Sequence, residues 1–179
     1  MDLDAKKFKY GLVLVINVLL VSMVLLILSH VGVRYSKSID VLEAKLLPAM
    51  QEILNADRHL YQARTAELEA ISLASTQQQH YVDIHHQHAQ QAKQGMLNFL
   101  ILLRDFPEVL QGLEVFETYF ARWQQSSSEV FYLLDSGQST KAEQLSLNRG
   151  YQNFIELREL YNLAGESAEQ LNADLTLKD

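Results

Sequence analysis

Apolar residues form one unbroken run near the N-terminus and recur at steps of three or four over the rest of the chain. The run, residues 11–29, holds nineteen uncharged residues, which as a helix span about 28 Å, close to the hydrocarbon thickness of a bilayer. A cleaved secretory signal has a shorter apolar core and a small-residue cleavage site, which the sequence after Ser29 does not provide. We therefore predict a transmembrane helix over 11–31.

The orientation of this span follows from the size of what comes after it. Three basic residues stand close to each end of the run, so charge alone gives a tie: Lys6, Lys7, Lys9, Arg34, Lys37 and Lys45. The tighter cluster lies on the N-terminal side, and long domains translocate largely regardless of charge. We predict a cytoplasmic segment over 1–10 and an external domain over 32–179.

The external domain is predicted to contain four helices, over about residues 38–76, 79–104, 107–134 and from 140 to the end of the chain. The first apolar seam is Leu47, Met50, Leu54, Asp57, Tyr61, Arg64, Leu68 and Ile71. The second is Tyr81, Ile84, His88, Gln91, Gly95, Phe99 and Leu102. The third is Val109, Leu113, Phe116, Phe120, Trp123, Ser127, Val130 and Leu134. The fourth is Leu147, Tyr151, Phe154, Leu157, Tyr161, Ala164, Ala168, Leu171 and Leu175.

Capping residues are predicted at three helix ends. Asp105 and Glu108 form a candidate N-terminal box for the third helix. Gly137 suits the left-handed position just after that helix, and Thr140 with Glu143 forms a second candidate box for the fourth.

Short connections and seams of about 3.5 residues predict an all-α fold, in which the N-terminal transmembrane helix continues into an antiparallel up-down four-helix bundle. In that topology the fourth helix returns to the membrane surface. It is still running at Asp179 without a capping residue, which favours a chain truncated before a second transmembrane helix.

Composition narrows the function. The chain of 179 residues has a net charge of −7, which disfavours nucleic acid as a partner because phosphate binding needs clustered Lys and Arg. It has no Cys, no Gly-rich phosphate loop and no catalytic motif of the HExxH or GxSxG type. We expect no enzyme activity, no cofactor and no metal.

Polar residues at seam positions are the candidates for ligand binding. Asp57, Tyr61 and Arg64 replace leucine in the first seam, and buried charges are costly unless paired. One interpretation is a polar pocket in which Arg58 or Arg64 grips a carboxylate or another anion. The other is a polar layer that fixes helix register or dimer pairing. The pocket interpretation gives six candidate ligand-binding residues: Arg58, Tyr61, Arg64, Thr65, Tyr151 and Gln152.

Four histidines lie in a Gln-rich stretch over residues 77–94. His85 and His88 are three residues apart, a spacing at which two imidazoles share a helix face. Two imidazoles without a third ligand make a weak metal site, so an exposed or pH-sensitive helix remains the simpler interpretation.

Several motifs resemble the N-terminal part of bacterial methyl-accepting chemotaxis proteins. They are Leu47-Pro48-Ala49, residues 56–63 (ADRHLYQA), residues 89–109 (AQQAKQGMLNFLILLRDFPEV) and residues 122–127 (RWQQSS). The resemblance implies a homodimeric four-helix periplasmic sensor domain in the bacterial inner membrane. It also implies a small-molecule ligand, such as an amino or organic acid, near the ends of the first and fourth helices. The signal would pass through the membrane by helix displacement.

Two alternatives fit the same pattern. One is the sensor half of a histidine kinase or of a cyclic-dinucleotide enzyme. The other is a membrane-anchored scaffolding coiled coil without a ligand, which the charged seam positions Asp57 and Arg64 disfavour.

Overall fold

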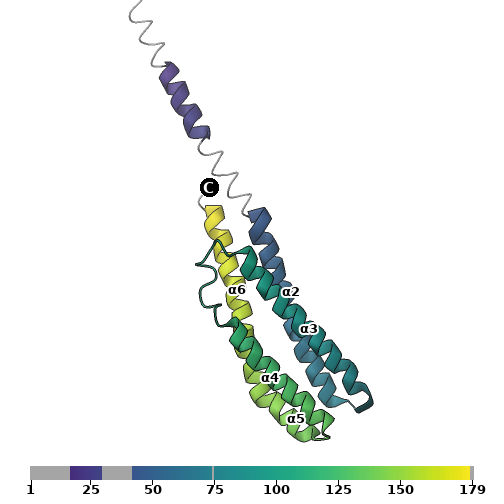
Figure 1. The fold of residues 1–179 in the computed structure, drawn as a ribbon. Helices are drawn as coiled ribbons and strands as arrows, with labels where there is room; N and C mark the ends of the chain where they lie inside the picture. Colours follow the sequence, from purple (N-terminus) through teal and green to yellow (C-terminus); the bar gives the residue numbers. More distant parts are fainter. Residues whose placement is uncertain (1–16, 30–41, 74, 178–179) are drawn as a thin grey trace, which may run out of the picture. The chain divides into compact units, whose positions relative to one another are not determined.

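The computed structural model of the chain describes residues 17–29, 42–73 and 75–177 (Figure 1). These residues are mostly helical and form no strand, which confirms the prediction of an all-α chain. The elements in chain order are η1 (Leu42–Leu46), α2 (Leu47–Ser72), α3 (Ser75–Leu102), α4 (Phe116–Asp135), α5 (Ser139–Leu145), η2 (Ser146–Gly150) and α6 (Tyr151–Leu177).

The predicted transmembrane segment is described only in its middle. Residues 17–29 are helical with exposed side chains, whereas residues 11–16 and 30–31 of the predicted span lie outside the described residues, as does the predicted cytoplasmic segment 1–10. No helix within the described ranges is both long and apolar enough to cross a membrane. Residues 42–178 form a compact unit of their own.

Helices α2 and α3 pack side by side along most of their length (Figure 1). Small residues make this close approach possible. A Cβ atom added at Gly95 would lie 2.7 Å from the Cβ atom of Ala56 and 3.0 Å from the carbonyl oxygen of Glu52. The buried residues of α2 are therefore mainly small: Ala49, Ala56, Ala63, Ala66 and Ala70, with Ile53 and Leu60 between them.

The predicted seam of the first helix is wrong in its position around the helix. Leu47, Leu54, Tyr61 and Leu68 of that seam are exposed, and the buried stripe lies one residue earlier along the chain. Alanine accounts for the error. Leucine dominates the predicted seam. In the closely packed pair of α2 and α3, however, alanine lies at the contact and the leucines of the seam lie on the outer surface.

The seam of the third helix is confirmed, because all eight of its residues are buried. The predicted start of this helix is wrong. Residues 105–115 form a chain of turns, and α4 begins at Phe116 without a side-chain cap. Gly112 explains the delay, since its φ of 85° is a left-handed conformation that interrupts a helix. Asp105 forms an ion pair with Lys45 at 2.5 Å instead of capping, and this pair holds the pKa of Asp105 below its usual value.

The turn after α4 confirms the role predicted for Gly137. Its φ is 71°, its N–H donates to the Leu134 carbonyl at 3.0 Å, and the Gln138 N–H donates to the Leu133 carbonyl at 2.8 Å. These two bonds define a Schellman motif. The box predicted at Thr140 is wrong, because α5 is capped at Gln138 without a side-chain hydrogen bond.

The seam of the fourth helix is confirmed from Phe154 to Leu171, but Leu147 and Tyr151 are exposed. The cause is η2, a π-helical turn between α5 and α6. A π turn inserts one extra residue and shifts the helix face by about 100°. Across the turn, the buried positions are consequently Ser146 and Gly150 rather than Leu147 and Tyr151.

Candidate functional site

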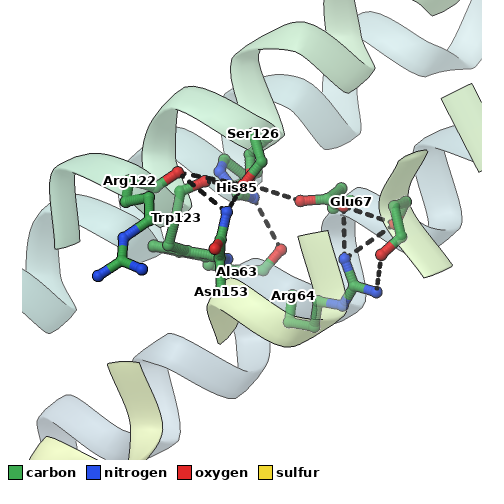
Figure 2. A network of polar contacts seen from close by, with 10 residues as sticks. Ala63, Arg64, Glu67, His85, Arg122, Trp123, Ser126 and Asn153 are labelled. Carbon is green, nitrogen blue, oxygen red and sulfur yellow. Dashed lines mark hydrogen bonds and ion pairs between the residues drawn. The ribbon is translucent and has the colours of Figure 1, made fainter. Parts of the chain in front are cut away.

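A buried network of charged and hydroxyl side chains surrounds Arg64 (Figure 2). The Nη1 atom of Arg64 donates to Oε1 of Glu67 at 2.5 Å and to Oγ of Ser146 at 2.8 Å. Its Nη2 atom donates to the Ser146 carbonyl oxygen at 3.0 Å. Arg64, expected from its sequence position to grip an anion, is thus paired with a carboxylate of its own helix and bonded to η2.

Glu67 is fully buried and accepts hydrogen bonds at both carboxylate oxygens. Ser146 Oγ donates to Oε1 and Ser127 Oγ donates to Oε2, each at 2.6 Å. Burial lowers the pKa of Arg64, and the neighbouring Glu67 carboxylate acts against this shift. Because both Nη atoms of Arg64 and both carboxylate oxygens of Glu67 have close partners, the network meets the condition under which a buried ion pair is tolerated.

The sequence analysis did not single out Glu67 or Ser146. A usable signal existed: Glu67 follows Arg64 by three residues, the spacing of a helical ion pair, and lies on the alanine stripe. Ser146 had no such signal, since its burial depends on the π turn. Gly150, in the same turn, borders the network: an added Cβ would lie 3.3 Å from the Leu145 carbonyl oxygen and 3.6 Å from Nη1 of Arg64, the latter an ordinary van der Waals distance.

His85 lies beside this network and is fully buried (Figure 2). Its Nδ1 donates to the carbonyl oxygen of Ala63 at 2.9 Å, and its ring packs against Trp123 and Phe131. Burial lowers the pKa of His85 despite the nearby Glu67 carboxylate. His85 and His88 therefore do not share an outward face: His88 instead stacks on His59 of α2, with ring centroids 5.2 Å apart.

No group of three or more potential ligand side chains suited to a metal ion occurs in the described part of the chain.

A second polar cluster lies between α2 and α6, and its contacts are incomplete. The Nε atom of Arg158 and Oδ1 of Asp57 are 3.7 Å apart, an ion-pair distance too long for a hydrogen bond. The Arg158 guanidinium instead covers the Tyr61 ring, 4.7 Å from its centroid. Within the described structure, neither Oδ1 of Asp57 nor Nε of Arg158 has a hydrogen-bond partner.

Tyr161 is the third member of this cluster. Its side chain is only 2% exposed, and its hydroxyl also lacks a hydrogen-bond partner among the described residues. Burial and then the negative charge of Asp57 raise the pKa of Tyr161. Burial also raises the pKa of Asp57, although Arg158 counteracts this shift.

A cavity of about 220 Å³ opens beside Asp57 and Tyr161. Both residues line it, together with two carboxylate side chains of α6, apolar side chains of α2 and a glycine. The remaining lining residues are Ile53, Leu54, Asn162, Gly165, Glu166 and Glu169.

The other residues predicted to bind a ligand lie on the surface. Arg58, Thr65, Tyr151 and Gln152 are exposed, as is Tyr61 in part. Tyr151 is close enough to Arg64 for its charge to affect the pKa of that residue, and Gln152 donates to Glu156 at 3.2 Å. A joint anion site made by these residues stays a prediction.

Comparison of the chain with protein-family models, with curated proteins and with solved structures finds no match.

Proposed function

We propose that the chain is the sensor region of a bacterial transmembrane receptor of the chemotaxis-transducer type. Residues 11–31 would anchor it in the inner membrane, and residues 32–179 would form a periplasmic four-helix bundle that detects a small molecule. The observation that carries this proposal is the packing of α2 on α6, the first and last long helices of the compact unit. These are the two helices that would connect such a domain to the membrane.

The contacts between α2 and α6 support transmission by helix displacement. At one level, η2 is fixed to α2 by the hydrogen bonds from Arg64 to Ser146. At another level, the polar contacts between α6 and α2 are the long Asp57–Arg158 pair and the Arg158–Tyr61 contact, beside an edge-on packing of Tyr61 on Phe154. A ligand shifts an equilibrium between two packings by its difference in affinity for them, and a loosely paired contact is where such a difference arises at small cost.

An exposed apolar stripe on α2 supports homodimer formation. Leu47, Leu54, Tyr61 and Leu68 follow one another at seven-residue intervals and are all exposed, Leu54 by 70%. A heptad of this kind on an outer helix face is the pattern that pairs two helices. The occupant that we propose is α2 of a second copy.

A hybrid receptor tests the proposed function. The chain would be joined through its C-terminus to the second transmembrane helix and signalling region of a chemotaxis receptor, in cells that lack other receptors. We expect a swimming response to at least one class of amines, amino acids or organic acids. A matched hybrid that lacks residues 42–177 should give none. Proper membrane insertion without a response to any compound would contradict the proposal and favour the scaffolding alternative.

Cysteine cross-linking tests the dimer separately. The chain has no native Cys, so only the introduced cysteines can form a disulfide. Leu54→Cys should form a disulfide-linked dimer in membranes under mild oxidation. Glu159→Cys, an exposed position of α6, serves as the control and should remain monomeric. Equal cross-linking of both variants would indicate random collision and contradict an interface along α2.

A further inference from the structure

The cavity between α2 and α6 combines negative charge, an unpaired buried hydroxyl and an apolar wall. Asp57, Glu166 and Glu169 contribute three carboxylates, against one guanidinium at Arg158. Acidic residues alone would indicate only a solvated surface. The second observation is Tyr161, which lines the cavity, is 98% buried and has a hydroxyl with no partner among the described residues.

Unpartnered buried polar atoms are rare in folded proteins and call for an explanation. Two of them, Oδ1 of Asp57 and the Tyr161 hydroxyl, belong to residues of this one cavity. A carboxylate oxygen only accepts hydrogen bonds, and a phenol oxygen can also accept one. The complementary ligand is therefore a donor with several N–H groups and a positive charge.

Apolar side chains also line the cavity and favour an alkyl group on the ligand. Ile53 and Leu54 line it on the α2 side, and Gly165 adds no side chain from α6. A Cβ atom added at Gly165 would meet no atom within 4 Å, so the space over this glycine is open.

We propose that this cavity is a binding site for a primary alkylammonium group, with Asp57 and Tyr161 receiving its N–H donors and Leu54 packing on its alkyl chain. This deepens the proposed sensor function by naming the ligand class, and it places the site about two helical turns along α2 from Arg64. It differs from the anion site predicted around Arg58 and Arg64, because here the carboxylates outnumber the cations.

The test measures binding to the full chain in detergent by calorimetric titration at constant ionic strength. The probe is propylammonium, and propionate is the anion of matched size. We expect saturable binding of propylammonium and none of propionate. Absence of saturable propylammonium binding, or equal binding of the two ions, would overturn the site.

Three variants locate the binding. Tyr161→Phe removes only the unpartnered hydroxyl and should weaken binding about 3- to 10-fold, the loss expected for one hydrogen bond. Asp57→Asn should weaken it more than about 10-fold, because a charge-assisted bond is lost. Glu159→Gln removes an exposed charge of α6, the helix of Tyr161, at a position outside the cavity. This variant should keep the wild-type affinity within about twofold.

Gly165→Leu blocks the cavity without removing any polar atom. Leucine is a better helix former than glycine, so the variant should fold at least as stably as the wild type. We expect it to lose propylammonium binding, whereas Gly165→Ala should retain most of it. Wild-type affinity in Gly165→Leu would overturn the site even if ammonium binding occurs elsewhere on the protein.

The hybrid receptor separates this inference from the proposed function. Binding that follows these variants, without any swimming response, would contradict the receptor proposal and leave the cavity assignment standing. A swimming response to other compounds, without propylammonium binding, would contradict the cavity assignment and leave the receptor proposal standing.

Discussion

Two polar clusters connect α2 to elements packed against it, one to α4 and η2 and the other to α6, and they differ in how completely their atoms are paired. Around Glu67, both carboxylate oxygens accept hydrogen bonds at 2.5–2.6 Å, from residues of α2, α4 and η2. Around Asp57, the one ionic contact is 3.7 Å long, and three polar atoms have no hydrogen-bond partner within the described structure. The first cluster has the properties of a structural connection and the second those of a site open to a ligand.

The two clusters also differ in how well their charges are balanced. The charges at Arg64 and Glu67 neutralise each other inside the protein at close range. Asp57, by contrast, has a raised pKa because burial outweighs the distant guanidinium. Its charged form consequently reduces stability at pH values above the folded-state pKa, and this penalty disappears as the pH falls towards 3.8, the unfolded value. An ammonium ligand would remove the same penalty at neutral pH.

Breaking the complete cluster should have the largest effect. Glu67→Ala leaves the Arg64 guanidinium buried without its counter-ion, which should reduce the free energy of unfolding by about 3–5 kcal/mol. Guanidinium denaturation followed by fluorescence measures it, since Trp123 is the only tryptophan and is buried close to the network. Glu69→Ala, an exposed neighbour, is the control and should change stability by less than about 0.5 kcal/mol. Similar losses in both variants would contradict the structural role.

A smaller loss is expected when one partner of the carboxylate is removed. Ser127→Ala deprives Oε2 of Glu67 of its hydrogen bond and should destabilise the fold by about 1–3 kcal/mol. Ser128→Ala is the matched control, because Ser128 is exposed and bonds only to its own helix. A neutral Ser127→Ala would mean that water replaces the lost donor and that the centre of the network is not dry.

The pH dependence of stability should reveal His85. Its folded-state pKa lies below 6.5 because burial disfavours the charged ring, so the folded protein binds fewer protons than the unfolded chain between that pKa and 6.5. Stability should be complete above pH 6.5 and fall on acidification, by at most about 1.4 kcal/mol per pH unit. Urea denaturation between pH 5 and pH 8 tests this expectation.

His85→Gln should flatten the acid slope, whereas His86→Gln, an exposed neighbour, should keep it. If the acid slope of stability is unchanged in His85→Gln, groups other than His85 cause the loss of stability on acidification.

The sequence predicted the helical class, the α4 seam and the turn at Gly137, because these depend on local signals: large apolar residues at helical spacing and a glycine after a helix end. The buried face of α2 was misjudged because its contacts are made by alanines, which a pattern of large apolar residues leaves out. The start of α4 was misjudged because Gly112 was not read as a helix breaker.

The candidate site was only partly visible in the sequence. Asp57 and Tyr61 stood out as polar seam residues, and both belong to the incompletely paired cluster. Arg158 is not among the residues that the sequence pattern predicts to bind a ligand, and Tyr161 belongs to the predicted seam of the fourth helix, which its burial bears out. Its unpaired hydroxyl depends on which side chains of α2 it meets. The π turn at η2, which places Ser146 beside Arg64, has no recognisable signature in the sequence.

The smallest loss of stability is expected where the pairing is absent. Tyr161→Phe removes a buried hydroxyl that bonds to no described residue, so the free energy of unfolding should fall by less than about 0.5 kcal/mol and can rise by about 1–3 kcal/mol, because the desolvation cost of an unpaired hydroxyl is removed. The measurement is the same fluorescence denaturation used for Ser127→Ala. That variant removes a hydroxyl of the same kind from the completely paired cluster. A loss above about 1 kcal/mol in Tyr161→Phe would show that the hydroxyl is bonded within the fold. The contrast between the two clusters, and with it the case for a ligand site at Asp57, would then fail.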